Sequence, residues 1–347
     1  MINDLFFAAS KMPRMSAHIP GCGGIFKSGD EDFCVEEIPA YEPSGEGDHV
    51  YLWIEKKNLT TPSLLDEISR HTGIPVRDLG VAGMKDKIGI TRQYVSVRAD
   101  KVDMDWNFSG EKFKVLHWAR HGNKLKTGHL RGNRFLLWLR GVGADAEQRC
   151  AEIAQHIRTV GFPNFYGSQR FGYDGNTIRE GLLALQGASK RHPDKRQYRM
   201  AISSVQSALF NVCLSERMRA GTLNVVQAGD ALQRHAGRSA FLCEDPAHDQ
   251  TRLDQGELCV TGPMLGPKML MTEGETAAQE ASVYERFGMD VDMFARIGSI
   301  AEGTRRPYVV IPEELDVSMD GEDLRLCFSL PSGGYASVLV REFQGDA

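Results

Sequence analysis

Residues 81–97 have the sequence VAGMKDKIGITRQYVSV, in which a turn after Gly83 leads into the alternating strand pattern TRQYVSV. The turn holds a single carboxylate, Asp86, between Lys85 and Lys87. A carboxylate between two cations keeps a depressed pKa and stays ionised, which suits a nucleophile or an electrostatic stabiliser better than a general acid. An ordinary turn aspartate explains the same string, so the rest of the chain has to decide between the two roles.

Strand and helix patterns surround this turn. Residues 25–60 alternate apolar and charged positions in DFCVEEI and in HVYLWIEKKN. The next segment predicts a helix with Thr61 as its N-cap, a buried stripe that begins at Leu64, and an end at Gly73. Beyond the turn, FKVLHWARH and GNRFLLWLRGV predict two further strands that flank a basic loop.

The middle of the chain is dominated by helical spacing. Helices are predicted over residues 146–159, 176–186, 201–220, 274–287 and 290–298. Residues 161–172 and 261–269 predict loops, and strand patterns return in RPYVVIP and DLRLCFSL. This order of sheet, helices and sheet predicts an α+β domain interrupted by an insertion of roughly 145 residues.

The composition is that of a globular chain. It has 347 residues, of which 41% are hydrophobic and 25% charged, enough for two domains of ordinary size. The longest apolar runs are far too short for a membrane span, and the N-terminus has no signal-peptide pattern. Seven cysteines without any CxxC pair predict reduced thiols and a cytoplasmic protein.

Positive charge is concentrated although the net charge is −5. One stretch without Asp or Glu, which we call the basic stripe, contains Lys112, Lys114, Arg120, Lys124, Lys126, Arg131, Arg134 and Arg140. A second cluster, KRHPDKRQYR, occupies residues 190–199. Basic patches on an otherwise acidic protein favour contact with a polyanion such as RNA.

Several reaction classes have no motif in the chain. It lacks GxxxxGK[ST], a strand-anchored GxGxxG, HExxH and GxSxG. Phosphoryl transfer, dinucleotide binding, a catalytic metal and a serine nucleophile are therefore disfavoured. Chemistry based on carboxylate, lysine and tyrosine side chains remains.

Five short strings, GMKDK…TRQ, NFYGSQRFG, GDAL, GPMLGPKM and LPSGGYASVLVRE, occur together and in this order. In this the chain resembles the TruD family of tRNA pseudouridine synthases, from FKSGDEDFCVEE at residues 26–37 to Glu342. The resemblance implies a pseudouridine-synthase domain, with a mixed, largely antiparallel sheet and flanking helices, formed by residues 1–160 and 308–347. It also implies an inserted, mostly helical TRUD domain at residues 161–307, with the RNA in the cleft between the two.

The reaction implied by the resemblance is the isomerisation of uridine to pseudouridine at position 13 of tRNA. It needs neither cofactor nor metal, and the target base is flipped out of the RNA into the cleft. The carboxylate either attacks the ribose or supports a glycal route. We expect a monomer, because no heptad or large apolar helical face is evident.

Several residues match the active-site motifs of the family. Asp86 corresponds to the catalytic nucleophile, Lys27 of FKSGDEDF to its basic partner, and Phe33 to a ring that contacts the substrate. Asn133 of RGNRF corresponds to an asparagine that contacts uridine, with a hairpin turn residue as the alternative. Lys85 is a candidate for guiding a phosphate or for keeping Asp86 ionised.

The remaining candidates lie in the second half of the chain. Gln169 and Arg170 of GSQRFG are expected to line the cleft, although a purely structural loop explains them nearly as well. Arg341 is a candidate for positive charge near Asp86, with a surface helix residue as the alternative. Tyr335 stands where the family has Phe beneath the flipped base, so its ring can stack and its hydroxyl adds a candidate general base.

Two other functions stay open at this point. A non-catalytic RNA-binding module would use the same cleft, but it would have no use for Asp86 together with Lys27. An RNA-cleaving enzyme would pair Asp86 with His117 or His121, although no second acid or base stands out.

Overall fold

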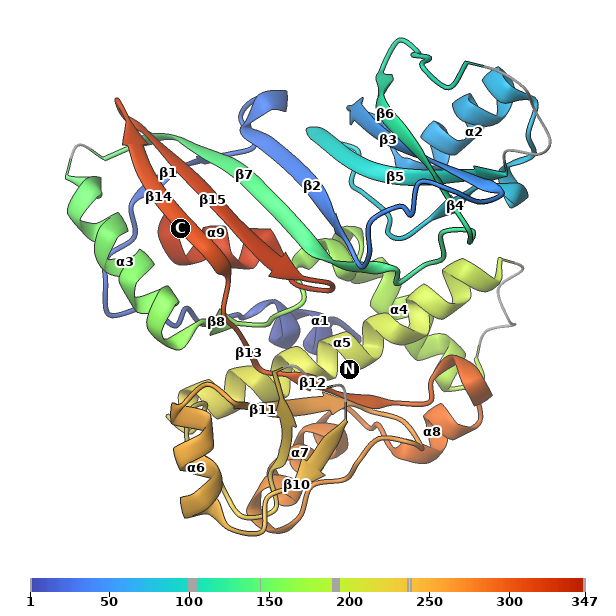
Figure 1. Cartoon of the computed structure of the whole chain (residues 1–347). Coiled ribbons are helices and arrows are strands. Elements are labelled where there is room, and N and C mark those ends of the chain that lie inside the picture. Colours follow the sequence, from blue (N-terminus) through green and yellow to red (C-terminus); the bar gives the residue numbers. More distant parts are fainter. Residues whose placement is uncertain are drawn as a thin grey trace. The chain divides into compact units, whose positions relative to one another are not determined.

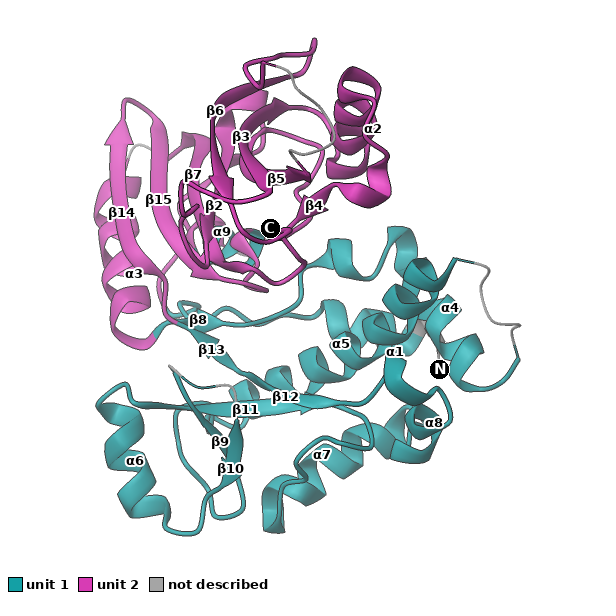
Figure 2. Ribbon diagram, turned by 45° about the vertical axis from the view of Figure 1, so that its right-hand side comes forward, with its two compact units in different colours: residues 1–18, 161–310, 337–342 teal, residues 19–160, 311–336, 343–347 magenta. Residues whose placement is uncertain are grey.

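The computed structural model describes residues 2–98, 105–143, 145–188, 194–235, 237 and 239–345. The chain divides into two compact units, each of which is described by itself (Figure 2). Unit 1 contains Met1–His18, Gly161–Val310 and Ser337–Glu342, and unit 2 contains Ile19–Val160, Ile311–Ala336 and Phe343–Ala347. The domain limits predicted above, and the cleft predicted between the domains, stay predictions.

Unit 2 is built on one mixed sheet whose strands run in the order β14-β15-β7-β2-β5-β3-β6, with β1 beside β7 and β4 beside β5 (Figure 1). Its strands are β1 (Gly23–Phe26), β2 (Phe33–Pro39), β3 (His49–Lys57), β4 (Gly80–Val81), β5 (Ile90–Arg98), β6 (Phe113–His121), β7 (Leu130–Val142), β14 (Glu313–Asp320) and β15 (Asp323–Pro331). Among the paired strands of the described residues, only β2 and β5 run parallel. The prediction of an α+β fold with a largely antiparallel sheet is therefore confirmed.

The sheet has two chemically different faces because side chains alternate along each strand. Phe33, Val35 and Glu37 of β2 point to one face, which we call the inner face, and all three are buried. Cys34 and Glu36 point to the other, which we call the outer face, and both are half-buried. Residues paired in register share a face, so the pairings place the rest of the sheet on one face or the other.

Helix α2 (Thr61–Thr72) covers the inner face of β3 and β5. Its stripe of Leu64, Leu65 and Ile68 packs in one core cluster with Ile54 and Val95. The helix ends at Gly73, which adopts φ +72° as predicted. A further helix of unit 2 is α3 (Ala146–Val160), whereas residues Ser337–Glu342 of α9 (Ala336–Gln344) belong to unit 1.

The predicted N-cap of α2 was wrong by one residue. Thr60, not Thr61, caps the helix, because its side chain accepts a hydrogen bond from the Ser63 amide at 3.2 Å. Thr61 occupies the first helical position, where its buried hydroxyl is available for other contacts. Two adjacent threonines are equally good caps, so the sequence alone could not distinguish them.

Unit 1 combines helices with a small sheet of order β10-β9-β11-β12. Its helices are α1 (Ile2–Ser10), α4 (Asn176–Leu185), α5 (Lys195–Arg219), α6 (Pro246–Asp254), α7 (Gly274–Arg286) and α8 (Val291–Ala295). Its strands are β8 (Phe162–Pro163), β9 (Ala231–Arg234), β10 (Ala240–Leu242), β11 (Leu258–Met264), β12 (Thr304–Pro307) and β13 (Val309–Val310).

The predictions for unit 1 were wrong at several places, since residues 162–163, predicted as a loop, form β8, and the helix predicted over residues 290–298 ends at Ala295. Residues 261–264, predicted as a loop, form the end of β11, and Gly262 allows the ring of Tyr308 to approach to within 2.1 Å of the position of a Cβ atom. Helix α5 begins at Lys195 instead of residue 201, because Asp194 caps it by accepting from the Arg196 amide at 2.8 Å. Residues 190–193 of the second basic cluster lie outside the described residues.

The GDAL string has a structural role. Asp230 is buried and accepts hydrogen bonds from the guanidinium of Arg217 at 2.7 and 2.6 Å and from Thr276 at 2.8 Å. A buried carboxylate is stable only when it is paired and hydrogen-bonded in this way. Within the described ranges, no helix is both long and apolar enough to cross a membrane.

Candidate active site

Asp86 lies on the loop of residues 82–89, between β4 and β5. Its side chain is exposed, whereas Ala82, Lys85 and Gly89 of the same loop are buried. The loop therefore presents one carboxylate to solvent while its neighbours are fixed in the protein.

Hydrogen bonds from buried side chains fix the first half of the loop. The Lys85 amide donates to Thr61 Oγ1 at 2.9 Å, and the Thr61 hydroxyl donates to Gln93 Oε1 at 3.0 Å. The other end of the Gln93 amide, Nε2, donates to the carbonyl of Gly83 at 3.3 Å. Thr61 and Gln93 together hold both sides of the turn that precedes Asp86.

The Lys85 ammonium is paired with Glu37 of β2 and not with Asp86. The Nζ–Oε2 distance is 2.8 Å, and the two side chains are 5% and 1% exposed. Burial raises the pKa of Glu37, while the positive charge of Lys85 opposes that rise. The Lys85 ammonium is thus held by a buried carboxylate, and its predicted roles, to keep Asp86 ionised or to guide a phosphate, stay predictions.

The second half of the loop is fixed at Gly89. Its amide donates to Asn58 Oδ1 at 3.1 Å, and the Asn58 amide donates back to the Gly89 carbonyl at 3.1 Å. Gly89 has φ +101°, and a Cβ atom there would lie 2.2 Å from the carbonyl oxygen of Phe33. Only glycine permits this approach, which brings the start of β2 against the loop.

Two lysines interact with Asp86. Lys56 donates from Nζ to the Asp86 carbonyl oxygen at 2.9 Å and also to the carbonyl of Leu59. Burial lowers the pKa of Lys27, and the negative charge of Asp86 opposes this shift. The Lys27 ammonium also lies 3.8 Å from the centre of the Phe33 ring, a cation–π contact. The predicted partnership of Lys27 with Asp86 thus has an electrostatic basis, and Phe33 joins the same cluster.

Asn133 lies on the inner face of β7, in register with Glu37 of β2 and Leu330 of β15. Its Oδ1 is buried and has no hydrogen-bond partner among the described residues, and the same holds for Oε1 of Glu37. Buried polar atoms of this kind are uncommon and call for an explanation. Asn133 is therefore not the hairpin turn residue considered above, but a mid-strand residue beside the anchor of the Asp86 loop.

Tyr335 follows β15 and is half-buried. The intervening turn is closed by a hydrogen bond from the Gly334 amide to the Pro331 carbonyl at 3.0 Å and tied to β7 by one from the Ser332 amide to the Arg131 carbonyl at 3.2 Å. β15 ends at Pro331, which pairs with Gly132 next to the pair of Leu330 with Asn133, so the turn that carries Tyr335 begins beside Asn133 in the sheet.

The other three candidates belong to unit 1, so their predicted substrate roles stay predictions. Arg170 donates to Ser207 Oγ at 3.3 Å and to Ser203, while Gln169 is exposed. Arg341 donates to the carbonyl of Met12.

Sequence reasoning missed the residues that hold the loop, namely Glu37, Lys56, Thr61 and Gln93. A signal for Lys56 was present, because it continues the inward series Val50, Leu52 and Ile54 of β3. A lysine at an inward position of a strand is unusual enough to mark a site. No comparable signal singled out Thr61 or Gln93.

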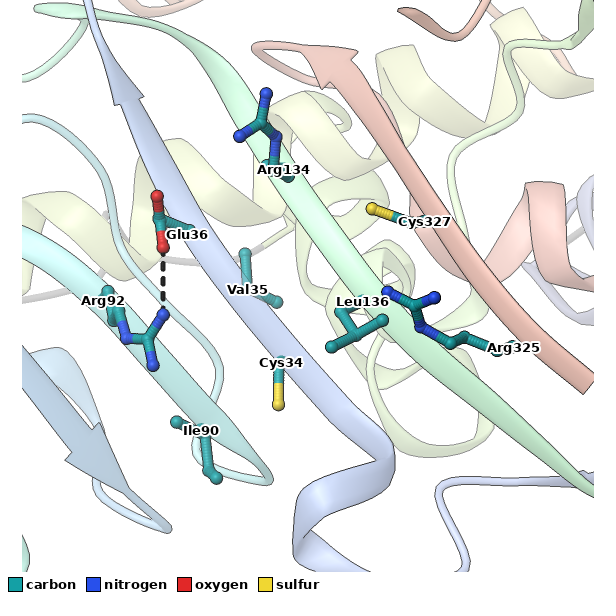
Figure 3. Close-up of a pocket in the computed structure, with 9 residues that line it drawn as sticks. All are labelled: Cys34, Val35, Glu36, Ile90, Arg92, Arg134, Leu136, Arg325 and Cys327. Atoms are coloured by element: carbon teal, nitrogen blue, oxygen red, sulfur yellow. Dashed lines mark hydrogen bonds and ion pairs between the residues drawn. The ribbon is translucent and has the colours of Figure 1, made fainter. Parts of the chain in front are cut away.

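The outer face carries a separate pocket of about 240 Å³ (Figure 3). Its lining residues are Cys34, Val35, Glu36, Ile90, Arg92, Arg134, Leu136, Arg325 and Cys327. Arg92 is paired there with Glu36 at 3.1 Å and with Glu55 at 2.9 Å. This pocket lies on the opposite face from the groups that hold Asp86, so we do not assign the chemistry to it.

The basic stripe is partly neutralised by acids from other strands. Lys114 pairs with Glu55 at 3.4 Å, Arg134 with Glu314 at 2.7 Å, and Arg140 with both Asp32 and Asp323. Lys126, by contrast, is exposed and has no ion pair with the described residues. These acidic partners come from other segments of the chain, so the sequence of the stripe itself gave no sign of them.

Each of the two histidines considered for RNA cleavage contacts a tyrosine. Tyr94 Oη lies 3.4 Å from Nε2 of His117, which is in register with Trp53 on the outer face. The ring of His121 stacks on Tyr41 at 5.0 Å between centroids. Within the described ranges, no group of three His, Cys, Asp or Glu side chains could hold a metal ion.

Comparisons with known proteins agree along the whole chain. The family model for tRNA pseudouridine synthase D (TruD) matches residues 11–192 and 183–343. A protein named tRNA pseudouridine synthase D from Anaeromyxobacter dehalogenans is 39% identical over 97% of each chain. One of the same name from Thermus thermophilus is 39% identical over 98% of this chain and 94% of its own. A crystal structure of a candidate TruD from Methanosarcina mazei, 22% identical, covers 98% of each chain with a TM-score of 0.74 and shares the fold.

Proposed function

The chain belongs to the TruD family of tRNA pseudouridine synthases, isomerases that convert uridine to pseudouridine in tRNA, and we propose that Asp86 is the nucleophile of this reaction. The observation that carries the proposal is the setting of Asp86. It is an exposed carboxylate on a loop that buried side chains hold from both ends, with the charges of Lys27 and Lys56 acting on it.

The reaction exchanges one bond to the ribose for another. The bond from C1′ to uracil N1 breaks, the uracil turns within the site, and a bond from C1′ to C5 forms. N1 gains a proton and C5 loses one, so the product is an isomer of the substrate. In the direct route the Asp86 carboxylate bonds to C1′ and is released when C5 attacks. In the glycal route it removes a proton from C2′ and later returns it.

Both routes begin and end with a free carboxylate at Asp86, which interacts with Lys27 and Lys56. A bond to C1′ or a proton from C2′ removes the negative charge that the two ammoniums face. The lysines therefore favour the breakdown of the intermediate and the return of free Asp86.

We propose substrate-holding roles for the other candidate residues. The target base is flipped out of the RNA stack, and the rings of Phe33 and Tyr335 hold it by stacking. Asn133 offers the buried amide oxygen described above, which suits the N3–H donor of uracil. Gln169, Arg170 and Arg341 are proposed to contact the RNA backbone.

A tritium-release assay tests the proposal. The protein is incubated with an unmodified tRNA transcript that carries tritium at uracil C5, and both released tritium and strand integrity are followed. We expect release from intact RNA, its loss in Asp86→Ala, and normal release by the control Asp320→Ala, which removes another exposed aspartate of unit 2. Release that survives in Asp86→Ala contradicts the assignment of Asp86.

The same assay separates the alternatives. Binding without release would support a non-catalytic module, and strand cleavage would support a nuclease. The outer-face position of His117 argues against the nuclease, because it points away from the inner-face groups that hold Asp86.

We further propose that the target is position 13 of tRNA, which rests on family membership alone. Transcripts in which only U13 is replaced by C should release no tritium, whereas replacement of another D-arm uridine should leave release unchanged. Release that persists without U13 would exclude this position as the target.

A further inference from the structure

Lys56 is a buried lysine of β3 whose side-chain hydrogen bonds to the described residues go to the Asp86 loop and to the turn before α2. Its side chain is 0% exposed. Its ammonium donates to two backbone carbonyls, those of Leu59 and Asp86. It thus joins the turn before α2 to the residue that carries the proposed nucleophile.

The charge of Lys56 has no salt-bridge partner among the described residues. The charged groups that face it are Lys85 and Asp86 of the loop, with Glu37 beyond Lys85 and Lys27 beyond Asp86. Arg92 of β5 and Lys114 of β6 pair with Glu55 on the outer face and point away. A buried cation without a paired carboxylate is costly, and such groups are retained mainly where they have a task.

We propose that Lys56 is a positioning residue, whose protonated side chain fixes the backbone of Asp86 and so aims its carboxylate at the ribose. Its bond to the Asp86 carbonyl is the one side-chain contact that the described residues make to the backbone of Asp86 itself. The other anchors act on Gly83, Lys85 and Gly89. Without Lys56, the loop would be held at both ends but not at its functional residue.

Protonation connects this role to pH. Burial and the positive charge of Lys85 lower the pKa of Lys56 to about 8, with Asp86 opposing the shift. Above that pH the ammonium becomes a neutral amine, which is a weaker donor to two carbonyls and no longer attracts the carboxylate. The inference rests on the proposed role of Asp86, since a loop without a nucleophile would not need to be aimed.

The test compares Lys56→Met with Lys57→Met in the full chain. Methionine matches the length of lysine without its nitrogen, and Lys57 is a half-exposed neighbour that only pairs with Asp30 and Glu31 at 3.8 Å. Single-turnover tritium release and tRNA affinity are measured from about pH 6.5 to about pH 9.5, a range that spans the lowered pKa. We expect Lys56→Met to lose about 100-fold in rate, as misplaced catalytic groups do, with unchanged affinity. The single-turnover rates of the wild type and of Lys57→Met should decline at alkaline pH. The residual rate of Lys56→Met should show no such decline.

A rate for Lys56→Met within about threefold of wild type would overturn the inference, since misplacement of a catalytic group costs far more. A loss of rate explained by lost tRNA affinity would overturn it as well. The proposed function is tested by a different variant, because it would be contradicted if Asp86→Ala stayed active.

If Lys56→Met does not fold, an NMR pH titration of the wild type decides. The backbone amide groups around the Asp86 carbonyl, which accepts the hydrogen bond from Lys56 Nζ, report on the loop. The NMR chemical shift of the Asp86 carbonyl carbon should titrate between about pH 7 and about pH 9 as the ammonium loses its proton. A carbonyl shift that stays constant over that range contradicts the inference.

Discussion

At the scale of single residues, Tyr335 tests how the base is held. If its ring only stacks, Tyr335→Phe should keep the wild-type rate, because phenylalanine offers the same π-face. Tyr335→Ala should lose about 1–3 kcal/mol of base stacking, measured as a drop in single-turnover rate or in tRNA affinity. A Tyr335→Phe variant that loses more than about tenfold in rate would instead support a general-base hydroxyl.

Asn133 is expected to matter for substrate and not for folding. Its Oδ1 has no hydrogen-bond partner among the residues that the structure describes, so Asn133→Ala removes an unsatisfied polar atom and should change the free energy of unfolding by less than about 1 kcal/mol. Pseudouridine formation should nevertheless fall by about 10-fold or more, since the uracil loses an acceptor. A variant that unfolds more easily but reacts normally would show that Asn133 is a structural residue.

The sequence could predict several residues of the site but not the pairs they form. Lys27, Phe33 and Asp86 were predicted by motif and their roles stay predictions, although the Lys27 ammonium does lie 3.8 Å from the centre of the Phe33 ring. The partner of Lys85 was missed because Glu37 is 48 positions away in the chain. Pairings over such distances depend on strand register, which no local pattern encodes.

At the scale of elements, the fit of the Asp86 loop against β2 depends on Gly89. A Cβ atom at Gly89 would clash with Phe33 and force a strained backbone, so Gly89→Ala should lose roughly 1–3 kcal/mol of stability and most activity. Gly73→Ala is the matched control, because Gly73 also has positive φ but nothing within 4 Å of its missing Cβ. Equal effects on activity would mean that backbone strain, and not the contact with Phe33, explains the loss.

The buried ammonium of Lys56 makes stability and activity respond to pH in opposite directions. Its pKa is about 8 in the folded protein against an ordinary value of 10.5, so the unfolded chain binds more protons between these values. Stability relative to Lys56→Met should therefore rise with pH across this window, by up to about 3 kcal/mol. Denaturant titrations of both proteins from about pH 7 to about pH 10 measure this difference. A difference that stays flat would show that Lys56 is not a titrating cation.

Element boundaries followed the sequence where local signals were strong. The end of α2 at Gly73 and the strands β6, β7 and β15 were predicted correctly. Residues 261–264 were predicted as a loop because glycine and proline usually interrupt strands, yet pairing with β12 holds them in β11. Tertiary contacts overrode the local preference there.

At the scale of the whole molecule, the basic stripe should contribute unevenly to tRNA binding. Lys126 is exposed and makes no ion pair with the described residues, so Lys126→Gln should lower the slope of log affinity against log salt by about 1. Arg140 donates to Asp32 at 2.8 Å and to Asp323 at 2.6 Å, so Arg140→Gln should leave the slope unchanged and reduce stability instead. Filter binding at several salt concentrations measures both slopes, and equal slopes for the two variants would contradict this division.

The overall order of sheet, helices and sheet was predictable because periodicity changes along the chain. The small sheet of unit 1 was not predicted, since β9 and β10 have four and three residues. Strands this short carry too few alternating positions to stand out from loops.

We propose that Asp86 performs the chemistry and that the surrounding side chains only hold Asp86 in position. Asp86→Asn keeps the shape of the side chain and removes its charge, so tRNA affinity and thermal stability should stay at wild-type values. Single-turnover pseudouridine formation should fall by about 1,000-fold or more, as expected when a nucleophile is removed. An Asp86→Asn protein that forms pseudouridine within about tenfold of the wild-type rate would contradict the account.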